Sequence, residues 1–433
     1  MYSGLVNVIK RTNTVSHIGK IENIIGMAIE ASGKKGSIGE INLIYNENEK
    51  RQIVAETVGF KDDKVLLMPY ESIKGVSAGT FVKNTNTCLK IPVGDFLRGR
   101  IIDAMGRPID GLGDFNTDQF FPVDNPLTNP LERPPIREKM EFGIKAIDGL
   151  LTIGKGQRMG IFSGSGVGKS TLLGMIAKNV KTDINVIALV GERGREVREF
   201  IETDLGEEGL KRSVLIVATS DQPAMLRMKC PMVATAIAEY FKNQGKDVLL
   251  MMDSLTRFAM AQREIGLAIG EPPIARGYTP SIYAEMPKLL ERSGNFKQGS
   301  ITGIYTVLVE GDDTNEPIAD TVRGIIDGHI VLTRRLANSN HFPAIDVNAS
   351  ISRLMSSIVS QEHLTNASKL RDILSIYEKN SDLISIGAYK AGTNHKLDSA
   401  VAKIDKINDL LKQGVNEKFS YEETTKMMAE ILK

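Results

Sequence analysis

The chain has 433 residues, of which 42% are hydrophobic and 25% charged, and its formal net charge at pH 7 is +1. This length exceeds what one hydrophobic core usually holds, so we expect two or three domains. The balanced charge gives no field that favours nucleic acid or an anionic membrane. No apolar run approaches the roughly 20 residues that span a bilayer. We therefore expect a cytoplasmic chain in which Cys88 and Cys230 are buried, reduced thiols.

Residues 1–92 predict a small N-terminal β-barrel domain. Apolar and polar residues alternate at the period of a strand in the segments 41–45 and 64–68. Turns rich in Gly and Asn separate such runs, as at 32–36. Short strands at this regular spacing are typical of small barrels.

Residues 93–350 predict a parallel α/β domain, and residues 351–433 a helical domain. The prolines that follow the barrel favour an extended connection. From about 143, strands then alternate with amphipathic helices, as in a parallel sheet. One of these helices is predicted to begin at Pro231 and to end near Gly245, because proline suits a first helical turn and glycine a C-terminal cap.

The most informative segment, 163–171, follows a short apolar strand at 159–162 and precedes a predicted helix. Glycines let consecutive backbone N–H groups turn towards a phosphate, and the helix dipole adds to the attraction. The spacing predicts a P-loop formed by Gly164, Ser165, Gly166, Val167, Gly168, Lys169, Ser170 and Thr171. Lys169 is expected to reach the β- and γ-phosphates, and Ser170 to ligate Mg²⁺. Ser163 stands where the strict pattern has its first glycine.

Two further apolar strands lead to acidic residues, one at its last position and one shortly after its end. The strand 247–253 ends in Asp253, which is placed to complete the Mg²⁺ shell opposite Ser170. Arg257, four residues later, could turn towards the same phosphates, but the pattern alone favours a surface ion pair.

The strand 184–190 precedes Glu192 and Arg193, and we expect it to lie beside the P-loop strand. Glu192 could then polarise a water for attack on the γ-phosphate, and Arg193 could neutralise charge on the transferred group. The helix dipole alone also favours a glutamate at a helix start, so both interpretations stay open. The sequence pattern alone indicates a structural role for Arg353 and a packing role for Phe342.

The motifs of this chain and the order of its predicted domains resemble those of a known family. The order of barrel, RecA-like P-loop ATPase core and helical domain is similar to the catalytic subunits of rotary ATP synthases and, more closely, to the ATPases of bacterial type III protein export, especially the flagellar branch. Besides the P-loop, the resemblance is carried by the segments 143–152, 191–200, 252–259, 327–332 and 382–389.

The resemblance implies a role for each candidate residue near the phosphates. Glu192 is implied as the residue that activates the attacking water. Arg193 and Arg257 are implied as neighbours of the γ-phosphate, and Asp253 as the carboxylate of the Mg²⁺ site.

Two more residues gain roles from the resemblance alone. Phe342 falls where the family stacks an aromatic ring on adenine, which implies ATP as the nucleotide. Arg353 falls where the family places an arginine finger that reaches the neighbouring subunit. Such a finger acts only in a closed ring, so we expect a homohexamer whose specific activity rises with protein concentration.

The family further implies that ATP hydrolysis energises flagellar protein export, by releasing cargo from chaperones and unfolding it. The implied partners are a stator-like regulator at the N-terminal region, a coiled-coil stalk protein, export-gate membrane proteins and chaperone–cargo complexes, which place the ATPase peripherally at the inner face of the cytoplasmic membrane. The segment 1–20 fits either an amphipathic helix for the regulator or the first barrel strand.

Three alternatives are weighed against this hypothesis. An injectisome ATPase of the virulence type shares every candidate residue and stays open. A non-catalytic nucleotide-binding ring subunit would not need the carboxylate of Glu192. Because Glu192 is present, the sequence speaks against this alternative. A nucleic-acid translocase would need a basic, aromatic N-terminal domain, and residues 1–92 hold no such cluster.

Overall fold

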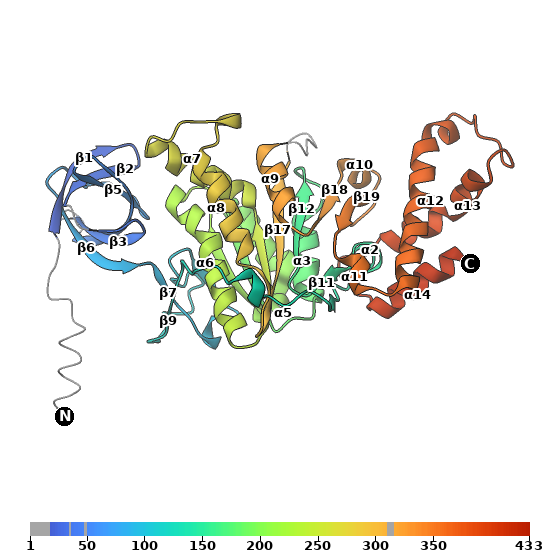
Figure 1. Ribbon diagram of the computed structural model, residues 1–433, viewed down its shortest axis with the longest axis horizontal. Helices are drawn as coiled ribbons and strands as arrows, with labels where there is room; N and C mark the ends of the chain where they lie inside the picture. Colours follow the sequence, from blue (N-terminus) through green and yellow to red (C-terminus); the bar gives the residue numbers. More distant parts are fainter. Residues whose placement is uncertain (1–17, 34–35, 47–49, 310–315) are drawn as a thin grey trace, which may run out of the picture.

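The computed structural model describes residues 18–33, 36–46, 50–309 and 316–433. They form a barrel, a central α/β core and a helical part in a row, with the barrel and the helical part at opposite ends of the molecule (Figure 1). This three-part fold confirms the predicted architecture. Residues 1–17 of the segment 1–20, for which a helix and a barrel strand were both open, lie outside the described residues. Within the described ranges, no helix combines the length and apolar character that crossing a membrane requires.

Six strands close into the N-terminal barrel in the order β1-β2-β5-β4-β3-β6. Alternate residues point inwards, and Ile44, Ile53 and Leu67 are fully buried between the strands. Their bounds are β1 (Ile18–Ile25), β2 (Ala28–Ser32), β3 (Glu40–Asn46), β4 (Arg51–Lys61), β5 (Lys64–Pro69) and β6 (Phe81–Cys88).

The two thiols differ in exposure, which corrects half of the cysteine prediction. Cys230 is buried as expected, but Cys88 is exposed. Cys88 is the last residue of β6 and belongs to three consecutive exposed residues at the end of this strand, which still pairs with β3 at Glu40. The prediction of a buried Cys88 was therefore wrong.

The core is built on one twisted sheet with the strand order β19-β18-β12-β17-β15-β13-β14-β8, and the short strand β16 pairs with β17. All neighbours along this order are parallel except β19, which is antiparallel to β18. The bounds are β8 (Ile101–Asp103), β12 (Arg158–Ser163), β13 (Ile184–Val190), β14 (Ser213–Ala218), β15 (Asp247–Asp253), β16 (Gly294–Asn295), β17 (Ser300–Leu308), β18 (Gly328–Leu332) and β19 (Ile345–Ser352).

Helices cover both faces of the sheet, which explains why its central strands are apolar throughout. In β13, Val186 and Ala188 pack into the same cluster as α6, α7 and α8, whereas Ile187 and Leu189 pack into the cluster of α3. The helices of the core are α2 (Lys145–Leu150), α3 (Lys169–Asn179), α4 (Gly194–Glu199), α5 (Gly206–Lys211), α6 (Ala224–Asn243), α7 (Leu255–Ala268), α8 (Pro280–Glu291), α9 (Pro317–Ile325) and α10 (Arg334–Asn338).

The long helix α6 corrects a predicted boundary. It begins at Ala224, not at Pro231, and the proline lies inside the helix. Most of its residues are buried between the sheet and its neighbours, so packing outweighs the hydrogen bond that the proline cannot make. The predicted end is confirmed, because Gly245 follows with the positive φ of +79° that glycine tolerates.

Short elements join these parts. Two small antiparallel pairs, β7–β9 and β10–β11, flank the sheet. Between them the proline-rich connection contains only a short 3₁₀ turn, which fits the predicted extended segment. The elements are β7 (Lys90–Pro92), β9 (Phe120–Pro122), β10 (Lys139–Met140), β11 (Ile153–Gly154), the 3₁₀ turns η1 (Asp95–Leu97), η2 (Pro130–Glu132) and η4 (Ala275–Gly277), and the π-helical segment η3 (Phe200–Leu205).

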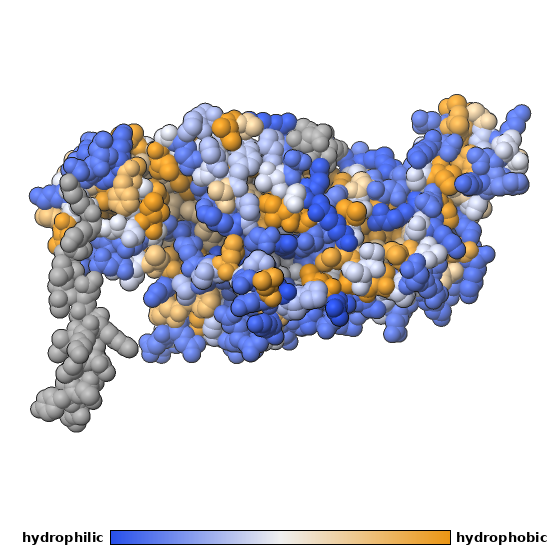
Figure 2. All heavy atoms as spheres, in the orientation of Figure 1, coloured by the Kyte–Doolittle hydropathy of each residue, from blue (hydrophilic) through white to orange (hydrophobic). Residues whose placement is uncertain are grey.

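The C-terminal part consists of helices α11 (Met355–Ile358), α12 (Gln361–Ser385), α13 (His395–Leu411) and α14 (Tyr421–Leu432). His363 of α12 ties this part to the core, because its Nε2 lies 2.6 Å from the carbonyl oxygen of Gly149 and its Nδ1 lies 2.6 Å from the hydroxyl of Tyr421. Apolar side chains gather at the outer end of α12 (Figure 2), where Leu383 and Ile386 are exposed.

A buried ion pair joins the barrel to the core. The ammonium of Lys229 in α6 lies 3.0 Å from Glu56 Oε1 in β4 and 3.6 Å from Asp124. The hydroxyl of Tyr70 donates to the other oxygen of Glu56. Burial alone would lower the pKa of Lys229, but the two carboxylates raise it, so this lysine stays charged. We call Lys229, Glu56, Tyr70 and Asp124 the barrel contact.

Candidate functional site

The predicted P-loop lies at the carboxyl edge of the sheet, between β12 and α3. Gly168 forms the N-cap of α3 in the left-handed conformation, and Gly166 also has a positive φ, of +76°. Both positions require glycine, because other residues adopt this conformation at a cost. The strand, loop and helix predicted around Lys169 are thereby confirmed, with the helix starting at Lys169 itself.

Lys169 lies between two acidic side chains at this edge. Its Nζ contacts Asp253 Oδ1 directly and lies 3.7 Å from Glu192 Oε1. All three side chains are largely buried. Burial would lower the pKa of Lys169, but Asp253 and Glu192 raise it, so the ammonium is charged. We call these three residues the edge cluster.

The strand order differs from the sequence-based expectation. We expected β13, which precedes Glu192, to lie beside the P-loop strand β12. Instead β17 and β15 lie between them. The carboxylate still reaches Lys169 because Glu192 follows the end of β13 in a turn that begins at Gly191 with a φ of +66°. A Cβ on Gly191 would lie 3.0 Å from the Cβ of Arg257, so glycine permits the close approach of the two segments.

Glu192 has the protonation behaviour expected of a proton acceptor near neutral pH. Burial, followed by the charge of Asp253, raises its pKa to about 7, against the opposing effect of Lys169. Its Oε1 is buried and accepts no hydrogen bond from the described residues. Arg257 lies close enough to act on this pKa as well, in the lowering direction. A carboxylate with this pKa and a free oxygen can take a proton from water.

Asp253 is held by a residue that the sequence did not single out. The hydroxyl of Thr306 in β17 donates to Asp253 Oδ1 over 2.7 Å. A threonine within an apolar strand carries no signal of its partner, because the pairing depends on strand order.

The residues at this edge fit a magnesium ion. Asp253 and the half-buried Ser170, in the first turn of α3, provide the carboxylate and hydroxyl oxygens that Mg²⁺ prefers. Within the described ranges, no group of three or more His, Cys, Asp or Glu side chains is arranged to hold a metal alone. A Mg²⁺ ion here would therefore need oxygens from a ligand and from water, as is usual where the ion is bound together with phosphates.

Phe342 lies over the P-loop. A Cβ on Gly168 would lie 3.5 Å from two ring carbons of Phe342, and this residue is 42% exposed. The phenyl group thus offers an open face beside the loop, on the segment between α10 and β19. An aromatic face in this position can stack on a base.

Two candidates lie apart from the edge cluster. The side chain of Arg193 is 81% exposed and pairs with Glu196 at 3.9 Å. Arg353 follows β19, whose last residue Ser352 pairs with Gly328 at the start of β18. Because the P-loop is at the opposite edge of the sheet, the exposed Arg353 points to the surroundings of the molecule rather than to its own cluster.

Family models match the chain in three stretches. Residues 21–86 match the ATP synthase alpha/beta family, beta-barrel domain, and residues 143–352 match its nucleotide-binding domain. Residues 359–430 match the T3SS EscN ATPase C-terminal domain. The boundaries follow the barrel, the core and the helical part.

Curated relatives match over nearly the full length. The flagellum-specific ATP synthase of Bacillus subtilis is 54% identical, and the match covers 97% of this chain and 96% of the relative. The type 3 secretion system ATPase of Xanthomonas euvesicatoria is 47% identical over 95% of this chain and 93% of the relative.

Solved structures agree with this picture. The assembled ATPase EscN of the enteropathogenic E. coli type III secretion system is 46% identical and superposes with a TM-score of 0.91, covering 96% of this chain and all of that one. The complex of EscN with its central stalk EscO gives a TM-score of 0.89 at 45% identity, with the same coverage.

Proposed function

Because the chain belongs to the family of flagellum-specific and type III secretion ATPases, we propose that it hydrolyses Mg²⁺-bound ATP in a ring of six identical copies, and that this hydrolysis drives the export of flagellar proteins. ATP hydrolysis is the activity of this family. The observation that carries the residue-level mechanism is the edge cluster, in which a P-loop lysine and two carboxylates converge.

Lys169 binds the phosphates in this mechanism. In the present structure its ammonium contacts Asp253. Phosphate oxygens of ATP replace that carboxylate, and the lysine then offsets their negative charge in a largely buried site. Asp253, held by Thr306, and Ser170 would hold Mg²⁺, which supplies further neutralisation of the β- and γ-phosphates.

Glu192 removes the proton from the attacking water. Oxygen of the water bonds to the γ-phosphorus while the bond to the ADP oxygen breaks, and the proton passes to Glu192. Arg257, which packs against Gly191 beside Glu192, neutralises charge on the transferred group. We assign Arg193 to the same charge, which its exposed side chain reaches by turning inwards.

Phe342 selects the base, and Arg353 completes the site of a neighbour. The exposed ring of Phe342 stacks on adenine beside Gly168. Arg353 lies at the opposite sheet edge and is exposed, which suits an arginine finger that reaches the edge cluster of the next copy. Fingers supplied in trans raise rates by roughly 10³–10⁵.

The ring can be tested separately from the chemistry. We expect the specific activity to rise with protein concentration, because each site needs the neighbour's arginine. Arg353→Ala should bind ATP normally and lose this rise. The control is Arg334→Ala, which removes an exposed arginine on α10. A rise that persists in Arg353→Ala would show that the finger is another residue.

The pathway is tested in the source bacterium. Glu192→Gln on the chromosome should abolish phosphate release by the purified enzyme and secretion of flagellin and hook protein, while Mg·ATP binding persists. Glu207→Gln, the same change at an exposed position of α5, serves as the control and should leave both intact. Normal flagellar secretion with lost ATPase activity would point instead to an injectisome, which the 47% identity to a type 3 secretion ATPase makes the second candidate.

A further inference from the structure

Gln413 is buried where the helical part meets the core, in the loop between α13 and α14. The residue is 6% exposed. Its Nε2 donates to the carbonyl of Gly143 over 2.8 Å, and its Oε1 accepts from the backbone N–H of Lys145 over 2.9 Å. Nε2 also donates to the carbonyl of Glu417 over 2.9 Å, within the same loop. One side chain therefore fixes this loop to the segment that opens α2.

The backbone of the same residue holds the segment that carries the aromatic ring. The N–H of Gln413 donates to the carbonyl of Phe342 over 2.9 Å. Phe342 therefore has two neighbours that hold it: its ring lies beside Gly168 of the P-loop, and its carbonyl accepts the hydrogen bond from Gln413. The contacts of its side chain to Gly143 and Lys145 place the N–H of Gln413, and this N–H holds the carbonyl of Phe342.

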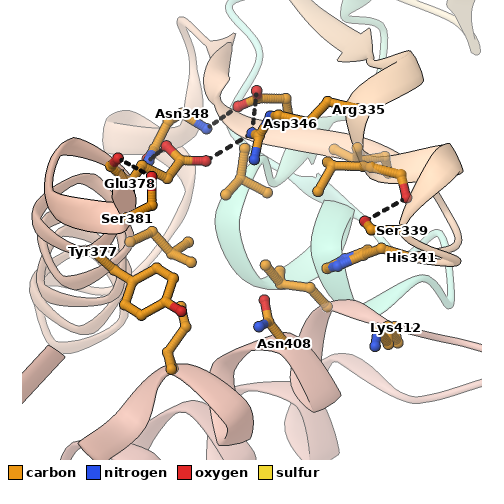
Figure 3. A pocket seen from close by; sticks show the side chains of 16 residues that line it. Arg335, Ser339, His341, Asp346, Asn348, Tyr377, Glu378, Ser381, Asn408 and Lys412 are labelled. Carbon is orange, nitrogen blue, oxygen red and sulfur yellow. Dashed lines mark hydrogen bonds and ion pairs between the residues drawn. The ribbon is translucent and has the colours of Figure 1, made fainter. Parts of the chain in front are cut away.

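A cavity lies near Phe342, beside the segment that carries it. It measures about 600 Å³ and lies between the segment α10–β19 and the helices α12 and α13, and residues that directly precede Phe342 and Gln413, namely His341 and Lys412, line it (Figure 3). Across the cavity Arg335 pairs with Glu378 at 2.8 Å, but these side chains are 60% and 38% exposed. Such an exposed pair contributes little to holding two elements together. The hydrogen bonds of Gln413 are buried, where an unmade bond is costly.

From this arrangement we propose that Gln413 is a positioning residue for base recognition: it holds Phe342 over the P-loop and makes the affinity for the base depend on the position of the helical part. The inference rests on the proposed role of Phe342 in stacking on adenine. When the helical part moves relative to α2, the loop moves with it and withdraws the support of Phe342, while the P-loop keeps its phosphate contacts.

The test separates base binding from phosphate binding. Gln413→Leu keeps the approximate volume and removes the side-chain hydrogen bonds. We expect the KM for ATP to rise about tenfold, while the inhibition constant of Mg-pyrophosphate, which has no base, stays unchanged. Gln361→Ala, an exposed glutamine at the start of α12, is the control and should change neither. Equal weakening of ATP and pyrophosphate would overturn the inference, because it would indicate a general disturbance of the site.

A double-mutant cycle with Phe342→Ala shows whether the effect passes through the ring. We expect Gln413→Leu to raise the KM for ATP in the wild-type background and to add little when Phe342 is already alanine. Additive effects would contradict the positioning role. If Phe342→Ala leaves the KM for ATP unchanged, the proposed adenine site fails, and this inference fails with it. If Phe342→Ala raises the KM and Gln413→Leu does not, only the inference fails.

Local unfolding could imitate the effect, so a second variant is included. Gln413→Glu keeps an oxygen that can accept from the N–H of Lys145. We expect its KM for ATP to lie between those of wild type and Gln413→Leu. A value as high as that of Gln413→Leu, with the same unfolding temperature as wild type, would contradict the role of this contact.

Discussion

Two largely buried lysines of this molecule differ in how completely the carboxylates beside them are hydrogen-bonded. In the barrel contact, both oxygens of Glu56 are engaged, one by Lys229 and one by the hydroxyl of Tyr70. In the edge cluster, Lys169 contacts Asp253, but Glu192 keeps a buried oxygen without a hydrogen bond from the described residues. The first arrangement is complete within the chain, and the second is not.

This difference separates a structural ion pair from the cluster to which we assign the chemistry. Both lysines stay charged in spite of burial because carboxylates surround them. A perturbed pKa alone therefore does not mark an active site, since structural pairs produce it as well. What distinguishes the edge cluster is its unsatisfied acceptor, beside a glycine loop that can receive phosphate. The following predictions test this distinction.

The largest expected effect is that of Lys169→Ala. Removing the only P-loop ammonium should lower the rate of phosphate release by about 10³-fold or more, because charge on the transferred group loses its main partner in a buried site. The rate is measured at saturating ATP. Turnover within about tenfold of wild type would refute the assignment of the edge cluster.

The barrel contact should respond in stability instead. Lys229→Ala leaves Glu56 charged and buried without its partner, which should lower the free energy of unfolding by about 3–5 kcal/mol. Urea unfolding measures this loss. Lys288→Ala, in an ion pair whose lysine is 62% exposed, is the control and should cost at most about 1 kcal/mol. If Lys229→Ala changed the kcat of the folded enzyme instead, the division between the two clusters would not hold.

The pH dependence of hydrolysis should belong to the edge cluster. Glu192 must be ionised to accept a proton, and its pKa is raised to about 7, so kcat/KM should fall about tenfold per pH unit below that value. The groups that act on it are Asp253, Lys169, Glu196 and Arg257. Lys229→Ala should show the same profile as wild type. The profile is measured from about pH 5.5, more than one unit below this pKa, to about pH 7. A flat profile over this range would contradict the role of Glu192.

Stability should follow the opposite trend at Glu192. Its pKa is near 4.5 in the unfolded chain and about 7 in the folded one, so the folded state binds the proton more tightly. This contribution to stability is present at low pH and is lost as the pH rises through about 7. Glu192→Gln has no titrating carboxyl at this position. Between about pH 4.5 and 7, its free energy of unfolding should therefore fall less than that of wild type.

The smallest effect is expected for Thr306→Val. The change keeps the shape of the side chain and removes the hydrogen bond to Asp253. We expect the concentration of Mg²⁺ that gives half-maximal rate to rise about fivefold to tenfold, as for one lost charge-assisted bond. The titration is done at fixed ATP. An unchanged Mg²⁺ requirement would show that Asp253 needs no such support.

Local sequence predicted the parts of the site that depend on local structure. The P-loop around Lys169 was predicted because glycine conformation, strand and helix are all encoded within a few residues. The end of β15 at Asp253 was predicted because a buried strand reads as an apolar run. The barrel and the helical part followed from their periodicities.

What depends on distant contacts could not be predicted. The order of strands in the sheet is not their order in the chain, so the separation of β13 from β12 was missed. Thr306 and Gln413 gave no signal, since their partners lie 53 and 268 residues away. The start of α6 was missed because burial on several sides tolerates Pro231 within the helix. The roles of Phe342 and Arg353 came from resemblance alone.

The closed barrel at the N-terminal end bears on assembly. Its strands β1 and β6 pair with each other from Ile18↔Lys83 to Lys20↔Phe81, and this pairing closes the barrel within the described residues. Closure of this kind disfavours joining of copies by extension of the barrel sheet, which is a route to aggregation. We therefore expect neighbouring barrels to contact each other through side chains on their outer faces, so that subunits come apart without loss of backbone hydrogen bonds.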